Sequence, residues 1–246
     1  MRTGVFTTIR IEQGQLWHDA WHRKRLLHDA SRIEQRLPVL AAYIRTHIDE
    51  AFHEAALAAS GQSGSGQQMA RLVFETDGQI PMHRAEVRGA RRQPWQPTAK
   101  PLALLLRPDP RPADELRVKW LERRCFSQVE AEAVRGGADG VVLHGPHSVH
   151  EGTWFHIAAR VEGDWCSPAA GTEVIYGATR AAFFHGARGE GLTCHEDALP
   201  MEKLARADAV FALSSLLGVA PVARIGELRF DASFSCWEQQ TWAHRL

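Results

Sequence analysis

Four short segments of this 246-residue chain carry side chains suited to covalent chemistry, and they follow one another in a defined order. They are Lys119, Glu151, Gly177-Ala178-Thr179-Arg180 and Ser214-Ser215. A lysine amine can form a Schiff base with an aldehyde, and a carboxylate can keep a ring nitrogen protonated. A Gly-Ala-Thr turn that opens a helix, and a serine pair that ends a strand, can each bind a phosphate. Together these segments supply what a phosphorylated aldehyde such as pyridoxal 5′-phosphate (PLP) needs from a protein.

Lys119 is the best candidate for the covalent bond. It lies between the apolar residues Val118 and Trp120, where partial burial would lower the pKa of its amine. The alternative is an ordinary surface lysine whose stem covers Trp120. The remaining lysines of the chain have more polar or proline-flanked neighbours and are Lys24, Lys100 and Lys203.

The other candidates also have ordinary structural explanations. Glu151 follows the polar stretch 147–150 and would be a solvated turn residue if it bound no ring nitrogen. Thr179 would be a helix N-cap, and Ser214-Ser215 would be the exit from an apolar strand. Arg25 offers a fork to phosphate oxygens, or else stands on a wet helix face. The order of the segments, rather than any one of them, favours a cofactor site.

Helices and strands are mixed along the whole chain. Periodic apolar residues predict helices that start near residues 19, 38, 119, 179 and 200, the third ending at Gly136-Gly137. Short apolar or alternating runs predict strands at residues 5–11, 71–75, 84–88, 102–107, 140–143, 154–161, 193–196 and 209–213, with a turn at 144–150. This mixture predicts an α+β (α/β mixed) fold.

The run from Arg107 to Pro112, with prolines at alternate positions, is the predicted domain boundary. Proline fixes φ and removes a backbone donor, so neither a helix nor a central strand continues through the run. The sequence predicts a small N-terminal α/β domain at residues 1–107, a linker at 108–112 and a larger C-terminal α/β domain at 113–246. The Gly/Ser-rich residues 60–66 predict a flexible surface connection.

Composition excludes several other classes of protein. The formal net charge is zero, which favours neither nucleic acid nor an anionic membrane as a partner. No apolar stretch is long enough for a signal peptide or a membrane span. The four cysteines are widely spaced, so we expect no metal site, no disulfide framework and a cytoplasmic location.

Taken together, the motifs resemble the fold-type IV PLP enzymes, also called class IV aminotransferases, from Gly4 to about Phe230. The matching segments are Gly4-Val5-Phe6-Thr7-Thr8-Ile9-Arg10, His22-x-x-Arg25-Leu26, Lys119, Glu151, Gly177-Ala178-Thr179-Arg180 and the run from Ala207 to Ser215. The resemblance implies two domains that enclose PLP at their interface, and a homodimer. It implies that Lys119 carries PLP, that Glu151 binds the pyridine nitrogen, and that the phosphate is held by Arg25, Ala178, Thr179, Ser214 and Ser215.

Within this family, the sequence is more similar to aminodeoxychorismate lyase than to the aminotransferases. Phe6-Thr7-Thr8 replaces the usual Phe-Glu of aminotransferases. Arg123 stands at the fourth position after Lys119, as in many of the lyases, and Arg124 stands at the fifth, where aminotransferases place a tyrosine. His156 stands in place of a usual asparagine, and Glu122 in place of another. We expect substrate contacts from Thr7, Thr8, Arg123 and His156.

The expected reaction is conversion of 4-amino-4-deoxychorismate to 4-aminobenzoate and pyruvate, a step of folate biosynthesis with a small-molecule substrate. Two alternatives stay open. The first is a class IV aminotransferase that acts on D- or branched-chain amino acids. The second is a non-catalytic PLP-fold protein that binds a ligand or partner.

Overall fold

The computed structural model describes residues 2–61, 67–90, 94, 99–112, 115, 117–171 and 173–233. Most of the flexible connection predicted at 60–66 lies outside these residues. The chain divides into two compact units. The N-terminal unit consists of Met1–Pro94 and Leu116–Arg123, and the C-terminal unit consists of Trp95–Glu115 and Arg124–Leu246.

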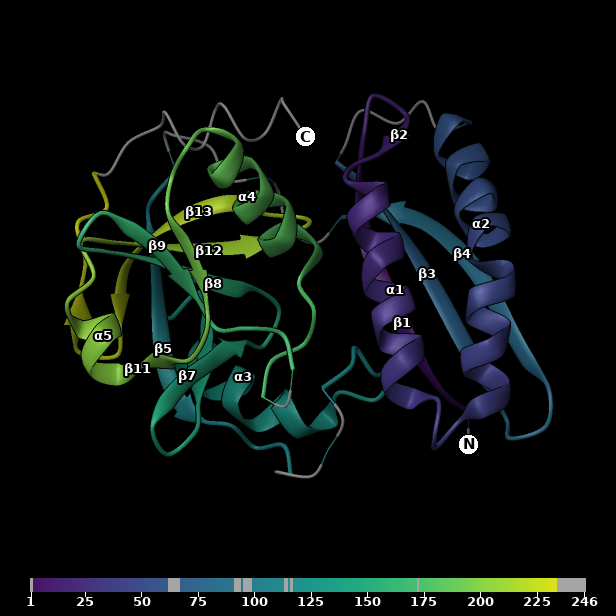
Figure 1. Ribbon diagram of the computed structural model, residues 1–246, viewed down its shortest axis with the longest axis horizontal. Coiled ribbons are helices and arrows are strands. Elements are labelled where there is room, and N and C mark those ends of the chain that lie inside the picture. Colours follow the sequence, from purple (N-terminus) through teal and green to yellow (C-terminus); the bar gives the residue numbers. More distant parts are fainter. Residues whose placement is uncertain are drawn as a thin grey trace. The chain divides into compact units, whose positions relative to one another are not determined.

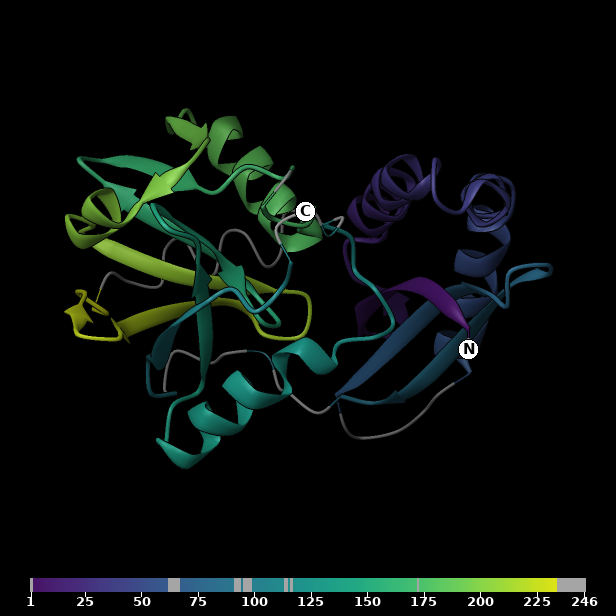
Figure 2. The ribbon, with the colours of Figure 1, turned by 90° about the horizontal axis from the view of Figure 1, so that it is seen from below.

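The N-terminal unit is a four-stranded sheet with two helices on one face (Figures 1 and 2). The strand order is β2-β1-β3-β4, and neighbouring strands are antiparallel. The elements are β1 (Thr3–Glu12), β2 (Gln15–Leu16), α1 (Asp19–Ile33), α2 (Pro38–Ser60), β3 (Gln68–Thr76) and β4 (Pro81–Gly89). Each predicted strand and helix of this region is therefore present, within a few residues at the ends.

Local sequence explains most of this unit. Gly14 adopts a φ of 75° in the turn between β1 and β2, a conformation that favours glycine. Pro38 occupies the first turn of α2, where its missing N–H costs no hydrogen bond. The apolar faces of both helices are buried against the sheet, with Leu26, Ile44 and Phe52 fully or almost fully inaccessible to solvent.

The segment around Lys119 pairs with β1 and is not helical. Val5 and Trp120 form an antiparallel bridge, and the amide of Phe6 donates to the Lys119 carbonyl at 3.0 Å. The prediction that a helix begins at Lys119 is therefore wrong, because these backbone groups bond to β1 instead of to a helical turn. Helical structure begins later, with η1 (Arg124–Phe126) and α3 (Ser127–Arg135), and ends at Gly136 as predicted.

The C-terminal unit contains a 10-stranded mixed sheet in the order β10-β9-β8-β12-β13-β5-β6-β7-β11, with β14 paired to β13. Its strands are β5 (Leu102–Pro108), β6 (Gly140–His144), β7 (Ser148–Gly152), β8 (His156–Val161), β9 (Asp164–Ser167), β10 (Cys194–Glu196), β11 (Leu199–Pro200), β12 (Ala209–Ser214), β13 (Gly218–Ile225) and β14 (Leu228–Arg229). Its other helices are α4 (Ala178–Gly189) and α5 (Met201–Ala205).

The prediction assigned residues 102–107 to the N-terminal domain, but β5, which contains them, belongs to the C-terminal unit. Strand β5 is parallel to both β6 and β13 and so belongs to the sheet of the C-terminal unit. An apolar run such as Leu102–Leu106 is typical of a strand with neighbours on both sides. Residues 116–123 return to the N-terminal unit through their pairing with β1.

Helices α3 and α4 lie on opposite sides of this sheet (Figure 2). Helix α3 packs its apolar side on β5 and β6, and α4 packs Phe183 and Phe184 against Phe211 of β12 and Trp165 of β9. A third cluster of buried apolar residues is drawn mainly from β5 to β9, from β11 to β13 and from α5. Helix α4 is thereby anchored with its first turn near the ends of β8 and β12.

Strand β7 corrects a further prediction. Residues 144–150 were expected to form a turn, but Ser148–Gly152 is a buried strand that pairs with β6 and β11. Polar residues such as His150 and Glu151 indicate a turn only when they are solvated, and both are buried here. In the part of the chain that the structure describes, no helix is long and apolar enough to cross a membrane.

Candidate cofactor site

Lys119 is held to the edge of β1 in the N-terminal unit. Its backbone carbonyl accepts a hydrogen bond from Phe6, and the next amide but one, that of Leu121, donates to the Gly4 carbonyl at 2.9 Å. The ammonium nitrogen lies 5.1 Å from the centre of the Phe6 ring, a cation–π distance. Two backbone hydrogen bonds around a partly buried lysine fix the position from which its amine can act.

Arg25 lies in the same unit and reaches the same strand. Its Nη2 donates to the Phe6 carbonyl at 2.7 Å, and its Nη1 is 3.5 Å from the Asp29 carboxylate. Burial lowers the pKa of the guanidinium, and the charge of Asp29 opposes that effect. Nη1 makes no hydrogen bond within the described part of the chain, so a buried donor is left for an anion.

His22 and Thr7 form a buried pair beside these residues. The Thr7 hydroxyl is 2.6 Å from His22 Nδ1, and both side chains are inaccessible or nearly so. Burial lowers the pKa of His22 well below its usual value, and the charges of Arg25 and Lys119 act in the same direction. The ring is therefore neutral near pH 7. Thr7 uses its hydroxyl on His22, whereas Thr8 on the other face of β1 is half-buried.

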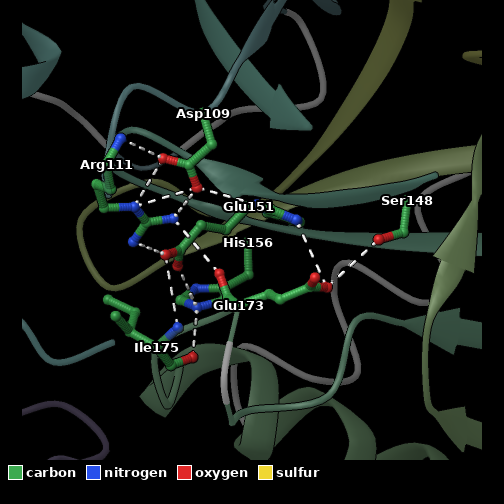
Figure 3. A network of polar contacts seen from close by, with 8 residues as sticks. Asp109, Arg111, Ser148, Glu151, His156, Glu173 and Ile175 are labelled. Atoms are coloured by element: carbon green, nitrogen blue, oxygen red, sulfur yellow. Dashed lines mark hydrogen bonds and ion pairs between the residues drawn. The ribbon is translucent and has the colours of Figure 1, made fainter. Parts of the chain in front are cut away.

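Glu151 lies in β7 at the centre of a buried polar network in the C-terminal unit (Figure 3). Its Oε1 accepts from Arg111 Nη1 at 2.7 Å, and its Oε2 is 3.2 Å from His156 Nε2. Burial raises the pKa of this carboxyl, but the His156 hydrogen bond and the charge of Arg111 outweigh burial and lower the pKa to about 2. Glu151 is therefore ionised at every pH at which the protein would be assayed.

His156 connects Glu151 with the start of α4. Its Nε2 is 3.2 Å from the Glu151 carboxylate and 3.2 Å from the Ile175 carbonyl, and both groups only accept hydrogen bonds. Nε2 therefore carries a hydrogen. A Cβ added to Gly177 would lie 2.6 Å from the His156 ring, so glycine is required there by close packing.

No side chain of the described residues caps the first turn of α4. Gly177 is its N-cap and has no side chain that could accept a hydrogen bond from them. The amides of Ala178, Thr179 and Arg180 have no partner within an α-helix, and the helix dipole adds partial positive charge at this end. Thr179 is thus inside the helix, and the alternative that it caps the helix is wrong. An N-terminus of this kind suits a phosphate.

The end of β12 lies at the same edge of the sheet. Leu213 is paired with His156 of β8, which places Ser214 one residue beyond that pair. The Ser214 hydroxyl accepts from the amide of Leu217 at 3.3 Å, and both serines are half-buried. The C-terminal unit therefore brings Glu151, His156, the first turn of α4 and Ser214 to one end of its sheet.

These residues fit PLP by their chemistry. A carboxylate that remains ionised while buried can keep a pyridine nitrogen protonated, and Glu151 meets that requirement. The start of α4, which no side chain caps, and Nη1 of Arg25, which has an ion pair with Asp29 but no hydrogen bond in the described residues, are suitable donors for phosphate oxygens. Lys119, a lysine fixed through its own backbone, has an amine of the kind that forms a Schiff base with an aldehyde.

The predicted site residues are divided between the two units. The N-terminal unit contains Thr7, Thr8, Arg25, Lys119 and Arg123, and the C-terminal unit contains Glu151, His156, Ala178, Thr179, Ser214 and Ser215. The sequence interpretation missed Asp109 and Arg111, which it assigned to a linker. Two opposite charges among prolines, Asp109 and Arg111, were a signal of a structured segment. Their role could not be read from the sequence, because Glu151, the buried partner of Arg111, is 40 residues away.

Comparisons with known proteins agree on the fold. The family "Amino-transferase class IV" matches residues 4–225. The fold IV-transaminase CpuTA1 of Curtobacterium pusillum has a TM-score of 0.78 at 20% identity, over 98% of this chain and 83% of that one. A PLP-bound hypothetical aminotransferase of Mycobacterium tuberculosis has a TM-score of 0.74 at 20% identity, over 98% and 86%.

A lyase has a similar structure. The 4-amino-4-deoxychorismate lyase of Pseudomonas aeruginosa has a TM-score of 0.69 at 21% identity, over 96% of this chain and 87% of that one. A search of the curated protein sequences gave no match. The expected α+β fold of fold-type IV is thereby confirmed.

Proposed function

Because this chain belongs to the amino-transferase class IV family, whose members are PLP-dependent enzymes, we propose that it converts 4-amino-4-deoxychorismate to 4-aminobenzoate and pyruvate. One observation carries the choice of reaction. Arg124 stands at the fifth position after Lys119, where the aminotransferases that this sequence resembles place a tyrosine, and Arg123 stands beside it. The proposed substrate has two carboxylates, and arginine is the side chain best suited to bind them.

PLP supplies an aldehyde that condenses with amines and a ring that withdraws electrons from the carbon bearing the substrate amine. Glu151 would hold the proton on the pyridine nitrogen, and Arg25, Ala178, Thr179, Ser214 and Ser215 would hold the phosphate. Lys119, once displaced by the substrate amine, would remove the proton from that carbon.

Elimination then follows from the structure of the substrate. When the substrate loses the proton from its amine-bearing ring carbon, the C–O bond to its enolpyruvyl group breaks. The six-membered ring of the substrate thereby becomes aromatic. Lys119 would return its proton to the enolpyruvyl carbon, which gives pyruvate, while the ring leaves as 4-aminobenzoate. Thr8, Arg123 and His156 are proposed to contact the substrate. Thr7 is proposed to act through His22, to which its hydroxyl is bonded.

The test is to incubate the purified protein with PLP and 4-amino-4-deoxychorismate and to measure 4-aminobenzoate and pyruvate. Equal amounts of both products, absent with Lys119→Ala, are expected. If wild-type protein that contains bound PLP forms neither product at any concentration, the lyase proposal is refuted.

The second candidate is an aminotransferase, which the matched family itself favours. Incubation with D- or branched-chain amino acids and 2-oxoglutarate would then give glutamate and a new 2-oxo acid. Activity in this assay together with none in the lyase assay would replace the first proposal. We also propose a cytoplasmic homodimer, which size measurement of the purified protein can check.

A further inference from the structure

Arg111 contacts Glu151 in a way that a solvent-exposed ion pair does not. Its Nη1 donates to Glu151 at 2.7 Å, while Nε and Nη2 donate to Asp109 at 2.9 and 2.6 Å (Figure 3). The Arg111 amide also donates to Asp109, at 3.0 Å. All three side chains are 4–6% exposed. Asp109 thus fixes the guanidinium plane, and that plane fixes one oxygen of Glu151.

The three side chains Asp109, Arg111 and Glu151 together carry one negative charge. Asp109 and Glu151 are each −1 and Arg111 is +1. Burial opposes the charge of Arg111, but its bonds to Asp109 and Glu151 outweigh burial and raise its pKa. Arg180, whose charge also acts near Glu151, is paired at 3.2 Å with Glu196, a carboxylate that it shares with the more exposed Arg188. One negative charge is what a protonated ring nitrogen needs as its partner.

Neighbouring histidines complete the set. His156 donates to Oε2 of Glu151, as described above. His150 lies 2.9 Å from Asp109 and 3.5 Å from Glu173. Without Asp109, the positive charge of Arg111 would cancel the negative charge of Glu151. The pair would then have no net charge with which to keep the pyridine nitrogen of PLP protonated.

We propose that Arg111 and Asp109 are positioning residues for the cofactor ring: Arg111 orients the Glu151 carboxylate, and Asp109 offsets the charge of Arg111. This inference rests on the proposed role of Glu151 at the pyridine nitrogen. A simpler role would be to tie residues 109–111 to β7, and that role depends on the contacts but not on the sum of the charges.

The experiment measures the protonation of the ring nitrogen directly. The holoenzyme is prepared with PLP labelled with ¹⁵N in the ring, and the nitrogen resonance is followed with pH. The variants are Asp109→Asn, Arg111→Met, the double variant Asp109→Asn/Arg111→Met, and Glu151→Gln. Arg107→Met is the matched control, because Arg107 forms a 2.7 Å ion pair with Glu132 in the same unit without touching Glu151.

Asp109→Asn keeps the size of the side chain and removes one negative charge. We expect the ring nitrogen to lose its proton at a pH about 1 to 3 units lower than in the wild type, the range over which one nearby charge shifts a pKa. The double variant has again a net charge of −1 and should return towards the wild-type profile. Arg111→Met should weaken PLP binding roughly 10- to 100-fold, as loss of a hydrogen bond to a charged group does. Arg107→Met should match the wild type.

The outcomes separate the inference from the proposed function. If Glu151→Gln moves the nitrogen profile but Asp109→Asn does not, the inference is refuted and the role of Glu151 stands. If Glu151→Gln also leaves the profile unchanged, the role of Glu151 itself is refuted. If the ring nitrogen of the double variant loses its proton at a lower pH than in either single variant, the inference is refuted. Asp109 and Arg111 would then have only the structural role of tying residues 109–111 to β7. If Arg111→Met fails to fold, the comparison of Asp109→Asn with the wild type still decides.

Discussion

Glu151→Gln should remove the part of the acid sensitivity of the C-terminal unit that comes from the Glu151 carboxyl. The substitution keeps the shape of the side chain, and its amide oxygen can still accept from Arg111. It removes only the negative charge that Arg111 and His156 stabilise. The difference between wild type and variant therefore reports the ionisation of one carboxyl.

The magnitude follows from the pKa. The carboxyl falls from 4.5 to about 2 on folding. At ~1.36 kcal/mol per unit, this shift corresponds to about 3 kcal/mol of stability. Because the folded value is the lower one, this contribution is present in full above pH 4.5 and is lost as the pH falls towards 2. We expect the variant to be about 3 kcal/mol less stable at pH 7 and nearly equal to the wild type at pH 2.

The assay is urea unfolding of the protein without PLP at pH 7, 5, 4 and 3, followed by tryptophan fluorescence and circular dichroism. Trp165, which is 1% exposed in the C-terminal unit, reports on the relevant transition. Asp109 remains in both proteins, so its own titration cancels in the difference. Glu132→Gln is the control, because its ion pair with Arg107 is partly exposed and screened by solvent.

One result would refute this reasoning. If the stability of Glu151→Gln declines between pH 5 and pH 3 as steeply as that of the wild type, Glu151 is not the ionised, paired carboxylate described above. A control variant Glu132→Gln that lost as much stability as Glu151→Gln would contradict the importance of burial.

Three further predictions concern the remaining site residues. Lys119→Ala should abolish product formation and the covalent attachment of PLP to the protein. That attachment is made permanent by borohydride reduction and is detected by mass spectrometry. The control variant Lys24→Ala should retain both. Gly177→Ala should destabilise the protein by ~1–3 kcal/mol, because its Cβ would lie 2.6 Å from the His156 ring. Adding His156→Asn should restore part of that loss in thermal unfolding, and no recovery would contradict the proposed clash. Arg25→Met should weaken PLP at least about tenfold but leave binding of pyridoxal, which lacks the phosphate, unchanged in titrations; equal losses for both would argue against a phosphate contact.

The parts of the fold that sequence reasoning identified are those with a local cause. The apolar periodicity of residues 19–33 and 38–60 predicts α1 and α2, and Pro38 marks the start of the second helix. The same holds for the glycine turn before α4, whose uncapped amides follow from Gly177 having no side chain. Such features depend on sterics and hydrogen bonds between residues close in the chain. The ordered motifs likewise indicated the family that the comparison over residues 4–225 confirms.

Tertiary contacts decided the rest. Residues 144–150 were expected to form a turn, yet Ser148–Gly152 is a buried strand, and its Glu151 is paired with Arg111 from 40 residues earlier. Residues 119–123 were expected in a helix, yet β1 bonds to the backbone of Lys119. Whether a charge is solvated or buried depends on partners distant in sequence, and no local pattern records them. The sequence therefore pointed to Lys119 and Glu151 as candidate site residues, and only the folded chain revealed that Arg111 and Asp109 are bonded to Glu151 in one buried network.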